Sequence, residues 1–111
     1  MADMPNDATG DALRRLAATG SDLSRPMEID FVVAVPSEAV GRQVARRVEP
    51  LGFRVSVKQD SDEGPWSCYC TKTIVPSYSD VVAIENQLDA IGRELGGYAD
   101  GFGSFGNALP H

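Results

Sequence analysis

Residues 27–57, MEIDFVVAVPSEAVGRQVARRVEPLGFRVSV, contain two strand patterns with a helix pattern between them, and this order decides the fold class. The first pattern, Met27 to Val35, alternates between apolar and polar residues at its start and then becomes wholly apolar, which predicts a strand buried on nearly both faces. Ser37 marks the start of the helix and Gly52 marks its end. The apolar stripe of that helix consists of Val40, Val44, Ala45, Val48 and Leu51.

The residues after Gly52 continue the alternation of strands and helices. The patterns predict a strand at 53–58, a turn at 60–65, a strand at 66–75, a helix at 77–95 and a short final strand at 98–105. Ser77 is the expected cap of the last helix, and Gly96 and Gly97 end it. Together with residues 27–57, these elements give the order βαββαβ.

This order is that of the ferredoxin-like split βαβ arrangement, an α+β fold in which two helices cover one face of an antiparallel sheet. An extra helix at 7–19 precedes the unit, and its docking position does not follow from the sequence. At 111 residues, we expect a single domain over 1–111 with an ordered core at about 7–105. The residues expected to face the two helices are Ile29, Phe31, Val33, Phe53, Val55, Val57, Trp66, Cys68 and Cys70.

The charge of the chain is −6 and is unevenly distributed. Residues 1–55 have seven basic and eight acidic side chains, whereas residues 56–111 have three basic and eight acidic ones. The second half therefore suits a basic partner, although acidity also serves solubility alone. Direct RNA binding is not expected, because the open face of the predicted sheet offers Tyr69 as its only aromatic residue in the first three strands, beside Glu28 and Asp30, which repel phosphate.

Two acidic groups are the candidate partner-binding surface. One is the predicted turn at 60–65 and the other is the polar side of the last helix, where Arg93 is the only basic residue. A solvated helix face is the competing interpretation for the second group. A basic cluster on the first sheet-covering helix, at 42–47, is expected to form a polar face that pairs with acids of the neighbouring helix. The candidate residues are Asp60, Asp62, Glu63, Glu85, Asp89 and Glu94.

Two motifs and the single histidine could carry chemistry, but none of them has the surroundings that its chemistry needs. No catalytic, cofactor or metal site is therefore predicted. The stretch GFGSFG at 101–106 has the spacing of a dinucleotide-binding loop, but no helix can begin there because Pro110 follows closely. The stretch DSDEG at 60–64 places glycine and threonine where a calcium loop needs oxygen ligands, including the glutamate at position 12. The only histidine is His111, the last residue, where nothing positions it as a base.

The two cysteines and the N-terminus bear on the compartment. Cys68 and Cys70 are two residues apart, so on a strand their side chains leave the same face about 6 to 7 Å apart, too far for an easy disulfide. Two small core residues is the favoured interpretation over a redox pair or half a metal site.

The N-terminal stretch lacks a secretory pattern, and no run approaches the ~18 apolar residues of a membrane helix. We expect a cytoplasmic protein without membrane contact.

Four segments resemble one family, the ribonuclease E inhibitors called regulator of ribonuclease activity B. They are LRRLAATGSDLSRPMEIDFVVAVPSEA at 13–39, LGFRVSV at 51–57, WSCYCTKTIVPSY at 66–78 and GGYADGFG at 96–103. The resemblance spans about residues 7–105, and Phe102 stands where the family often has tryptophan. It implies a ferredoxin-like α+β fold and a non-enzymatic protein that binds the C-terminal scaffold region of ribonuclease E and restrains RNA decay.

Two hypotheses for function follow. The first is a protein-binding regulator whose acidic second half engages a basic scaffold segment, which agrees with the absence of a recognisable catalytic set. The alternative is a ferredoxin-like small-molecule sensor, because Gly101 and Gly103 would let a ligand approach the backbone closely.

Overall fold

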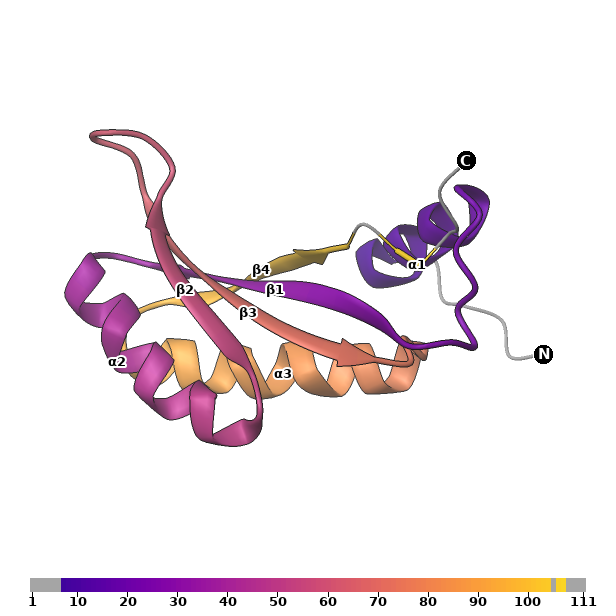
Figure 1. Cartoon of the computed structure of the whole chain (residues 1–111). Coiled ribbons are helices and arrows are strands. Elements are labelled where there is room, and N and C mark those ends of the chain that lie inside the picture. The colour runs from indigo at the N-terminus through magenta and orange to yellow at the C-terminus, as the bar shows by residue number, and fades with distance from the viewer. Residues whose placement is uncertain (1–6, 105, 108–111) are drawn as a thin grey trace.

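The computed structural model describes residues 7–104 and 106–107 (Figure 1). After the first helix, its strands and helices follow the predicted order βαββαβ. A single 3-10 turn, η1, separates the second helix from the second strand. The elements are α1 (Ala8–Ala18), β1 (Met27–Val35), α2 (Glu38–Val48), η1 (Glu49–Leu51), β2 (Arg54–Gln59), β3 (Trp66–Ile74), α3 (Tyr78–Glu94) and β4 (Tyr98–Gly103).

The four strands form one antiparallel sheet in the order β2-β3-β1-β4. Phe31 in the central strand β1 lies opposite Cys70 of β3 on one side and Phe102 of β4 on the other. Helices α2 and α3 pack side by side on one face of this sheet (Figure 1). The opposite face, here called the open face, carries no helix over β1, β2 or β3 in the described part of the chain. The predicted α+β class with an antiparallel sheet is confirmed.

Each of the three helices is capped at its N-terminus by a side chain that accepts a backbone N–H. Asp7 caps α1 by accepting the Gly10 N–H, Ser37 caps α2 by accepting the Val40 N–H, and Ser77 caps α3 by accepting the Asp80 N–H. Each cap satisfies a backbone donor that has no partner within the helix. The sequence patterns therefore locate the three helix starts to within one residue or so.

The core lies between the sheet and helices α2 and α3. Phe31 is at its centre, with its ring 6.3 Å from that of Phe53 and 5.9 Å from that of Phe102, measured between centroids. Most of the residues predicted to face the helices are buried, but Val55, Val57 and Trp66 are only partly buried, because β2 is at the edge of the sheet and Trp66 begins its strand. The buried apolar residues are Leu13, Met27, Ile29, Phe31, Val33, Val35, Val44, Val48, Phe53, Cys68, Cys70, Val81 and Leu88.

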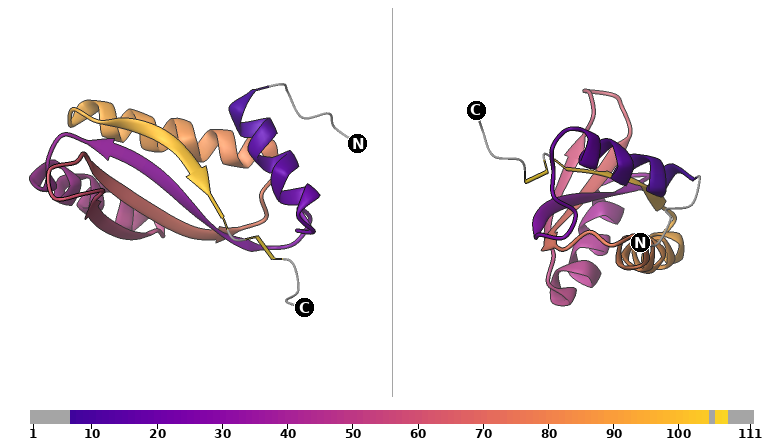
Figure 2. Two further views of the ribbon diagram at one scale, coloured as in Figure 1. Left: turned by 90° about the horizontal axis from the view of Figure 1, so that it is seen from above. Right: turned by 90° about the vertical axis from the view of Figure 1, so that its right-hand side faces the viewer.

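Helix α1 lies at the end of the sheet and docks on the start of α3 (Figure 2). Leu13 is fully buried there. Two hydrogen bonds fix the contact: the Thr9 hydroxyl donates to Glu85 at 2.7 Å, and the Tyr78 hydroxyl donates to Asp7 at 2.6 Å. The structure thus supplies the docking position that the sequence leaves open.

The junction between α3 and β4 brings two backbones very close together. A Cβ atom on Gly97 would lie 2.3 Å from the carbonyl oxygen of Ala34 in β1. Only glycine fits at this point, since real Cβ atoms do not approach a backbone oxygen so closely. Gly96, with φ of 95°, supplies the left-handed turn that ends α3.

Three details differ from the sequence expectations. Leu51, expected on the buried stripe of the second helix, is 38% exposed because the chain leaves α2 at Val48 for the turn η1. The alternation of the strand at 66–75 predicts that Ser67 and Thr71 face outward; both do lie on the open face but are buried, and the Thr71 hydroxyl donates to Asp30 at 2.5 Å. Strand β3 ends at Ile74, β4 ends at Gly103, and the predicted Phe105 lies outside the described residues.

Asn107 holds the connection between α1 and β1. Its side-chain amide donates to the carbonyl oxygens of Asp22, Arg25 and Pro26, and its oxygen accepts the Asp22 N–H at 2.8 Å. The polar stretch at 21–26 therefore has a fixed path, although it contains no helix or strand.

Candidate functional site

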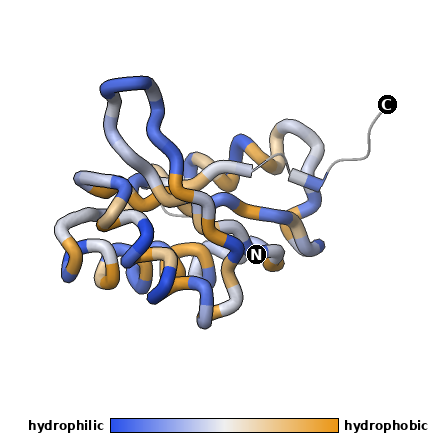
Figure 3. The backbone as a smooth tube through the Cα atoms, turned by 60° about the vertical axis from the view of Figure 1, so that its left-hand side comes forward, coloured by the Kyte–Doolittle hydropathy of each residue, from blue (hydrophilic) through white to orange (hydrophobic). Residues whose placement is uncertain are grey.

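The loop between β2 and β3 carries the first group of predicted acidic residues. The loop closes through two backbone hydrogen bonds, from the Asp60 N–H to the Pro65 oxygen and from the Gly64 N–H to the Ser61 oxygen, each 3.0 Å long. Asp60, Asp62 and Glu63 are exposed. The loop projects from the sheet on the side away from α2 and α3 (Figure 1) and is strongly hydrophilic (Figure 3). Its carboxylates are thus presented to solvent.

The second predicted group, on α3, is engaged within the molecule. Glu85 accepts the Thr9 hydroxyl of α1. Glu94 pairs with Arg47 of α2 at 2.6 Å, so one arginine of the basic cluster does pair with the neighbouring helix as expected. These carboxylates help to join α3 to its neighbours.

Asp89 has the most specific of these contacts. One carboxylate oxygen accepts the backbone N–H of Ala99 in β4 at 2.9 Å, and the other accepts from the Arg93 guanidinium at 2.7 Å. These two donors hold the pKa of Asp89 below its usual value of 3.8, because both favour the charged form. Asp89 therefore remains an anion that ties the last strand to α3.

The six predicted acidic residues do not form one continuous surface. The loop residues lie on the open-face side of the sheet, and α3 lies on the covered side (Figures 1 and 2). Arg42 forms an exposed ion pair with Glu38 of its own helix at 2.6 Å. A partner that engages the loop therefore meets the open face rather than α3.

Tyr98 is the residue that sequence reasoning missed. It lies opposite Ala34, so it stands on the open face, and its side chain is 48% exposed. Tyr69 lies opposite Val32 on the same face, with the Lys58 ammonium 5.6 Å from its ring centroid. The sequence pattern of β4 is too weak to show which of its residues face the core, so their faces follow only from the pairing of β4 with β1. That pairing shifts in register between Phe31 and Val33 of β1. The open face thus carries Tyr69, as expected for the first three strands, and in addition Tyr98 of β4.

Cys68 and Cys70 are free thiols buried in the core, as the spacing predicts. Burial raises the pKa of Cys68 to about 11, and burial together with the neighbouring Cys68 raises that of Cys70 to about 12. Both remain protonated at neutral pH and are poor nucleophiles. Within residues 7–104 and 106–107, no three histidine, cysteine or acidic side chains gather in a way that could hold a metal ion.

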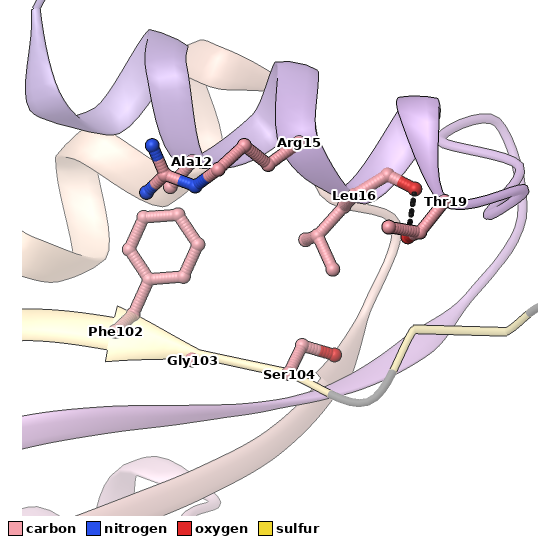
Figure 4. A pocket seen from close by; sticks show the side chains of 7 residues that line it. All are labelled: Ala12, Arg15, Leu16, Thr19, Phe102, Gly103 and Ser104. Carbon is pink, nitrogen blue, oxygen red and sulfur yellow. Dashed lines mark hydrogen bonds between the residues drawn. The ribbon is translucent and has the colours of Figure 1, made fainter.

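A cavity of about 270 Å³ lies between α1 and β4 (Figure 4). Arg15 and Phe102 point toward each other across it, and Gly103 and Ser104 form part of its wall. A smaller adjoining hollow includes Glu85 and Gly101. Of the glycine-rich stretch singled out in the sequence, Gly101 and Gly103 belong to strand β4 and line these two hollows.

The fold and these surfaces define a small α+β protein whose notable features are charged and aromatic surfaces rather than an assembled catalytic group in its described part. The chain belongs to the family described as regulator of ribonuclease activity B, whose sequence model matches residues 6–104. Membership in this family implies a role in regulating ribonuclease activity. A search of curated protein sequences finds no match. No helix within the described residues is both long enough and apolar enough to cross a membrane.

Proposed function

We propose that this protein is a non-enzymatic regulator that binds the C-terminal scaffold region of ribonuclease E and so restrains RNA decay in the cytoplasm. The observation that carries the proposal is the family match over residues 6–104, nearly the whole chain. The excess of acidic side chains in residues 56–111 supports a basic protein segment as the partner. The strand order β2-β3-β1-β4, with α2 and α3 on one face, supports assigning the domain to the ferredoxin-like class.

Among the acidic candidates, Asp60, Asp62 and Glu63 are best placed for a partner. They are exposed on a projecting loop, and no ion pair involves them in the described part of the chain. Glu85, Asp89 and Glu94 have internal partners, so their contribution to binding is expected to be smaller. Exposed charges on a loop raise the rate of encounter more than the final affinity.

The test is titration calorimetry of the whole chain with overlapping fragments of the ribonuclease E scaffold region at two salt concentrations. The proposal predicts heat with at least one fragment and a weaker affinity at the higher salt, because salt screens exposed charges. Changing Asp62 and Glu63 together to Asn and Gln should reduce the salt dependence. The absence of heat with every fragment, or affinity that is indifferent to salt, contradicts the proposal.

The cavity between α1 and β4 supports a second candidate, a small-molecule sensor. Arg15 offers a cationic group beside an aromatic ring, and Gly101 and Gly103 leave the backbone accessible. A thermal-shift screen against metabolites separates the two functions. A saturable rise in melting temperature favours the sensor, and no rise with any compound rejects it.

A further inference from the structure

The open face has a defined composition that follows from the register of the strands. Residues that alternate with the buried positions of β1, and their direct neighbours across the sheet, share this face. Residues paired across neighbouring strands form rows that cross the whole sheet, because β1 pairs with both β3 and β4, and β3 also pairs with β2. The members are Glu28, Asp30, Val32 and Ala34 of β1, Ser67, Tyr69, Thr71 and Thr73 of β3, Arg54, Ser56 and Lys58 of β2, and Tyr98 of β4.

The centre of the open face is apolar and aromatic. Val32 and Ala34 are half-buried in the middle strand, with Tyr69 beside the first and Tyr98 beside the second. Tyr98 is one of the few large apolar side chains in the described chain that are strongly exposed. Tyrosines in such positions are typical anchors of protein interfaces, because one rigid ring supplies a large contact area.

The charge around this centre is mainly negative. Glu28, Asp30 and the loop acids 60, 62 and 63 surround it. Among the described residues, these five carboxylates share the face with two cationic side chains, Arg54 and Lys58. One of the two, Arg54, is already near Glu28 at 3.3 Å in an exposed ion pair. The surface therefore attracts cations and repels phosphate.

The second cation shows how a basic side chain fits the face. The Lys58 ammonium lies 5.6 Å from the Tyr69 ring centroid, within the range of a cation–π contact. Lys58 is exposed, so an arginine from a partner would take its place without disturbing the core. Arginine also stacks on tyrosine rings more readily than lysine does, because its guanidinium is planar.

From these features we infer that the open face, extended by the β2–β3 loop, is the docking surface for an arginine-containing basic segment of a protein partner, with Tyr69 and Tyr98 as its aromatic contacts. The inference rests on the proposed function in that the scaffold region of the ribonuclease is the expected source of the segment. RNA is the rejected occupant, since the acidic rim opposes a polyanion.

The first experiment maps binding on the wild-type chain by nuclear magnetic resonance. Two probes are titrated into ¹⁵N-labelled protein: the ribonuclease E fragments and a synthetic twelve-residue peptide of alternating arginine and alanine. The inference predicts that amide shifts concentrate on β1, β3, β4 and the β2–β3 loop. Shifts concentrated on α2 and α3 overturn it, and so does a response of the open face to an RNA oligonucleotide of the same length.

The second experiment compares two matched variants by calorimetry. Tyr98→Ala removes an exposed ring from the open face. It should weaken the binding of the ribonuclease E fragment and of the arginine peptide about tenfold, as expected for an aromatic anchor. Leu51→Ala removes a comparably exposed apolar side chain beyond α2 and should leave the affinity unchanged. Circular dichroism melts check that both variants are folded. Equal affinities for the two variants overturn the inference.

The outcomes separate the inference from the proposed function. If a ribonuclease fragment binds but Tyr98→Ala has no effect, the docking surface is wrong and the proposed partner stands. If no fragment binds but the arginine peptide maps to the open face, the partner is wrong and the surface stands. If neither probe binds, both are rejected.

Discussion

The carboxylate of Asp89 in α3 accepts the backbone N–H of Ala99 in β4 at 2.9 Å, across the turn that joins the two elements. β4 is an edge strand, and this N–H lies at the point where the strand begins. The bond therefore supplies a partner for a strand-edge donor that the sheet itself does not satisfy. A carboxylate that looks like part of a solvated helix face thus anchors the last strand of the sheet.

Removing this carboxylate should loosen the start of β4. We expect Asp89→Ala to lower the free energy of unfolding by about 1 kcal/mol, since a hydrogen bond to a partly exposed charged group is lost. Native-state hydrogen exchange should show faster exchange of the Ala99 amide than in the wild type. Glu63→Ala, which removes an exposed loop carboxylate, is the control and should leave that amide unchanged. Unaltered exchange at Ala99 in Asp89→Ala would contradict this role.

The contact between Tyr78 and Asp7 makes the docking of α1 sensitive to acid. The Tyr78 hydroxyl, and then the Gly10 N–H, lower the pKa of Asp7 from its usual value of 3.8, and the same contact raises the pKa of Tyr78. A carboxyl whose pKa is depressed by folding stabilises the folded state above its unfolded pKa. That contribution is lost as the pH falls through the folded value.

Tyr78→Phe should therefore move the pKa of Asp7 back toward 3.8. Titration of the Asp7 carboxyl by nuclear magnetic resonance from pH 2 to pH 6 measures the shift directly. The value should remain somewhat depressed, because the Gly10 N–H still donates to the carboxylate. A pKa of Asp7 that is the same in both proteins would show that the tyrosine does not act on it.

Gly97 should tolerate no side chain. In Gly97→Ala the new Cβ meets the Ala34 oxygen at 2.3 Å, so one of the two backbones must move. We expect a loss of about 2 kcal/mol or more and a fall in melting temperature of roughly 10 °C. Gly103→Ala, at the far end of the strand that follows Gly97, is the matched control because nothing lies within 4 Å of its Cβ position. Equal melting temperatures for the two variants would contradict the close approach.

The buried thiols should be protected in the native state. Cys68 and Cys70 are shielded from solvent and have pKa values of about 11 and about 12, so little thiolate exists at pH 8. Labelling with a thiol-specific reagent should be slow in buffer and complete in denaturant. The labelling rate should follow the opening of the structure, so destabilising variants should be labelled faster. Rapid labelling of either cysteine in the folded protein would contradict the core assignment.

The fold was largely predictable because its local signals agree with each other. Ser37 and Ser77 cap helices at the expected places, and the alternation in β1 and β3 places Phe31 and Cys70 on the buried face. Each of these signals depends on residues a few positions apart. Agreement between capping, periodicity and turn residues is what makes such predictions reliable.

The candidate site was less predictable, since its features depend on contacts between distant segments. The bond from Thr9 to Glu85 cannot be read from one helix, whereas the ion pair from Arg47 to Glu94 agrees with the pairing expected for the basic cluster at 42–47. The exposure of Tyr98 depends on its pairing with Ala34, which is set by the whole sheet. Charge alone therefore indicated a candidate acidic surface, but the topology decides which acidic residues remain available to a partner.

The proposed function is regulation of ribonuclease E through binding of its scaffold region. The most direct measurement is the rate at which ribonuclease E cleaves an RNA substrate, with and without this protein, for the full-length enzyme and for its catalytic domain alone. If the protein acts through the scaffold region, cleavage by the full-length enzyme should be slower and cleavage by the catalytic domain should not change. Equal inhibition of both enzymes, or inhibition of neither, would contradict it.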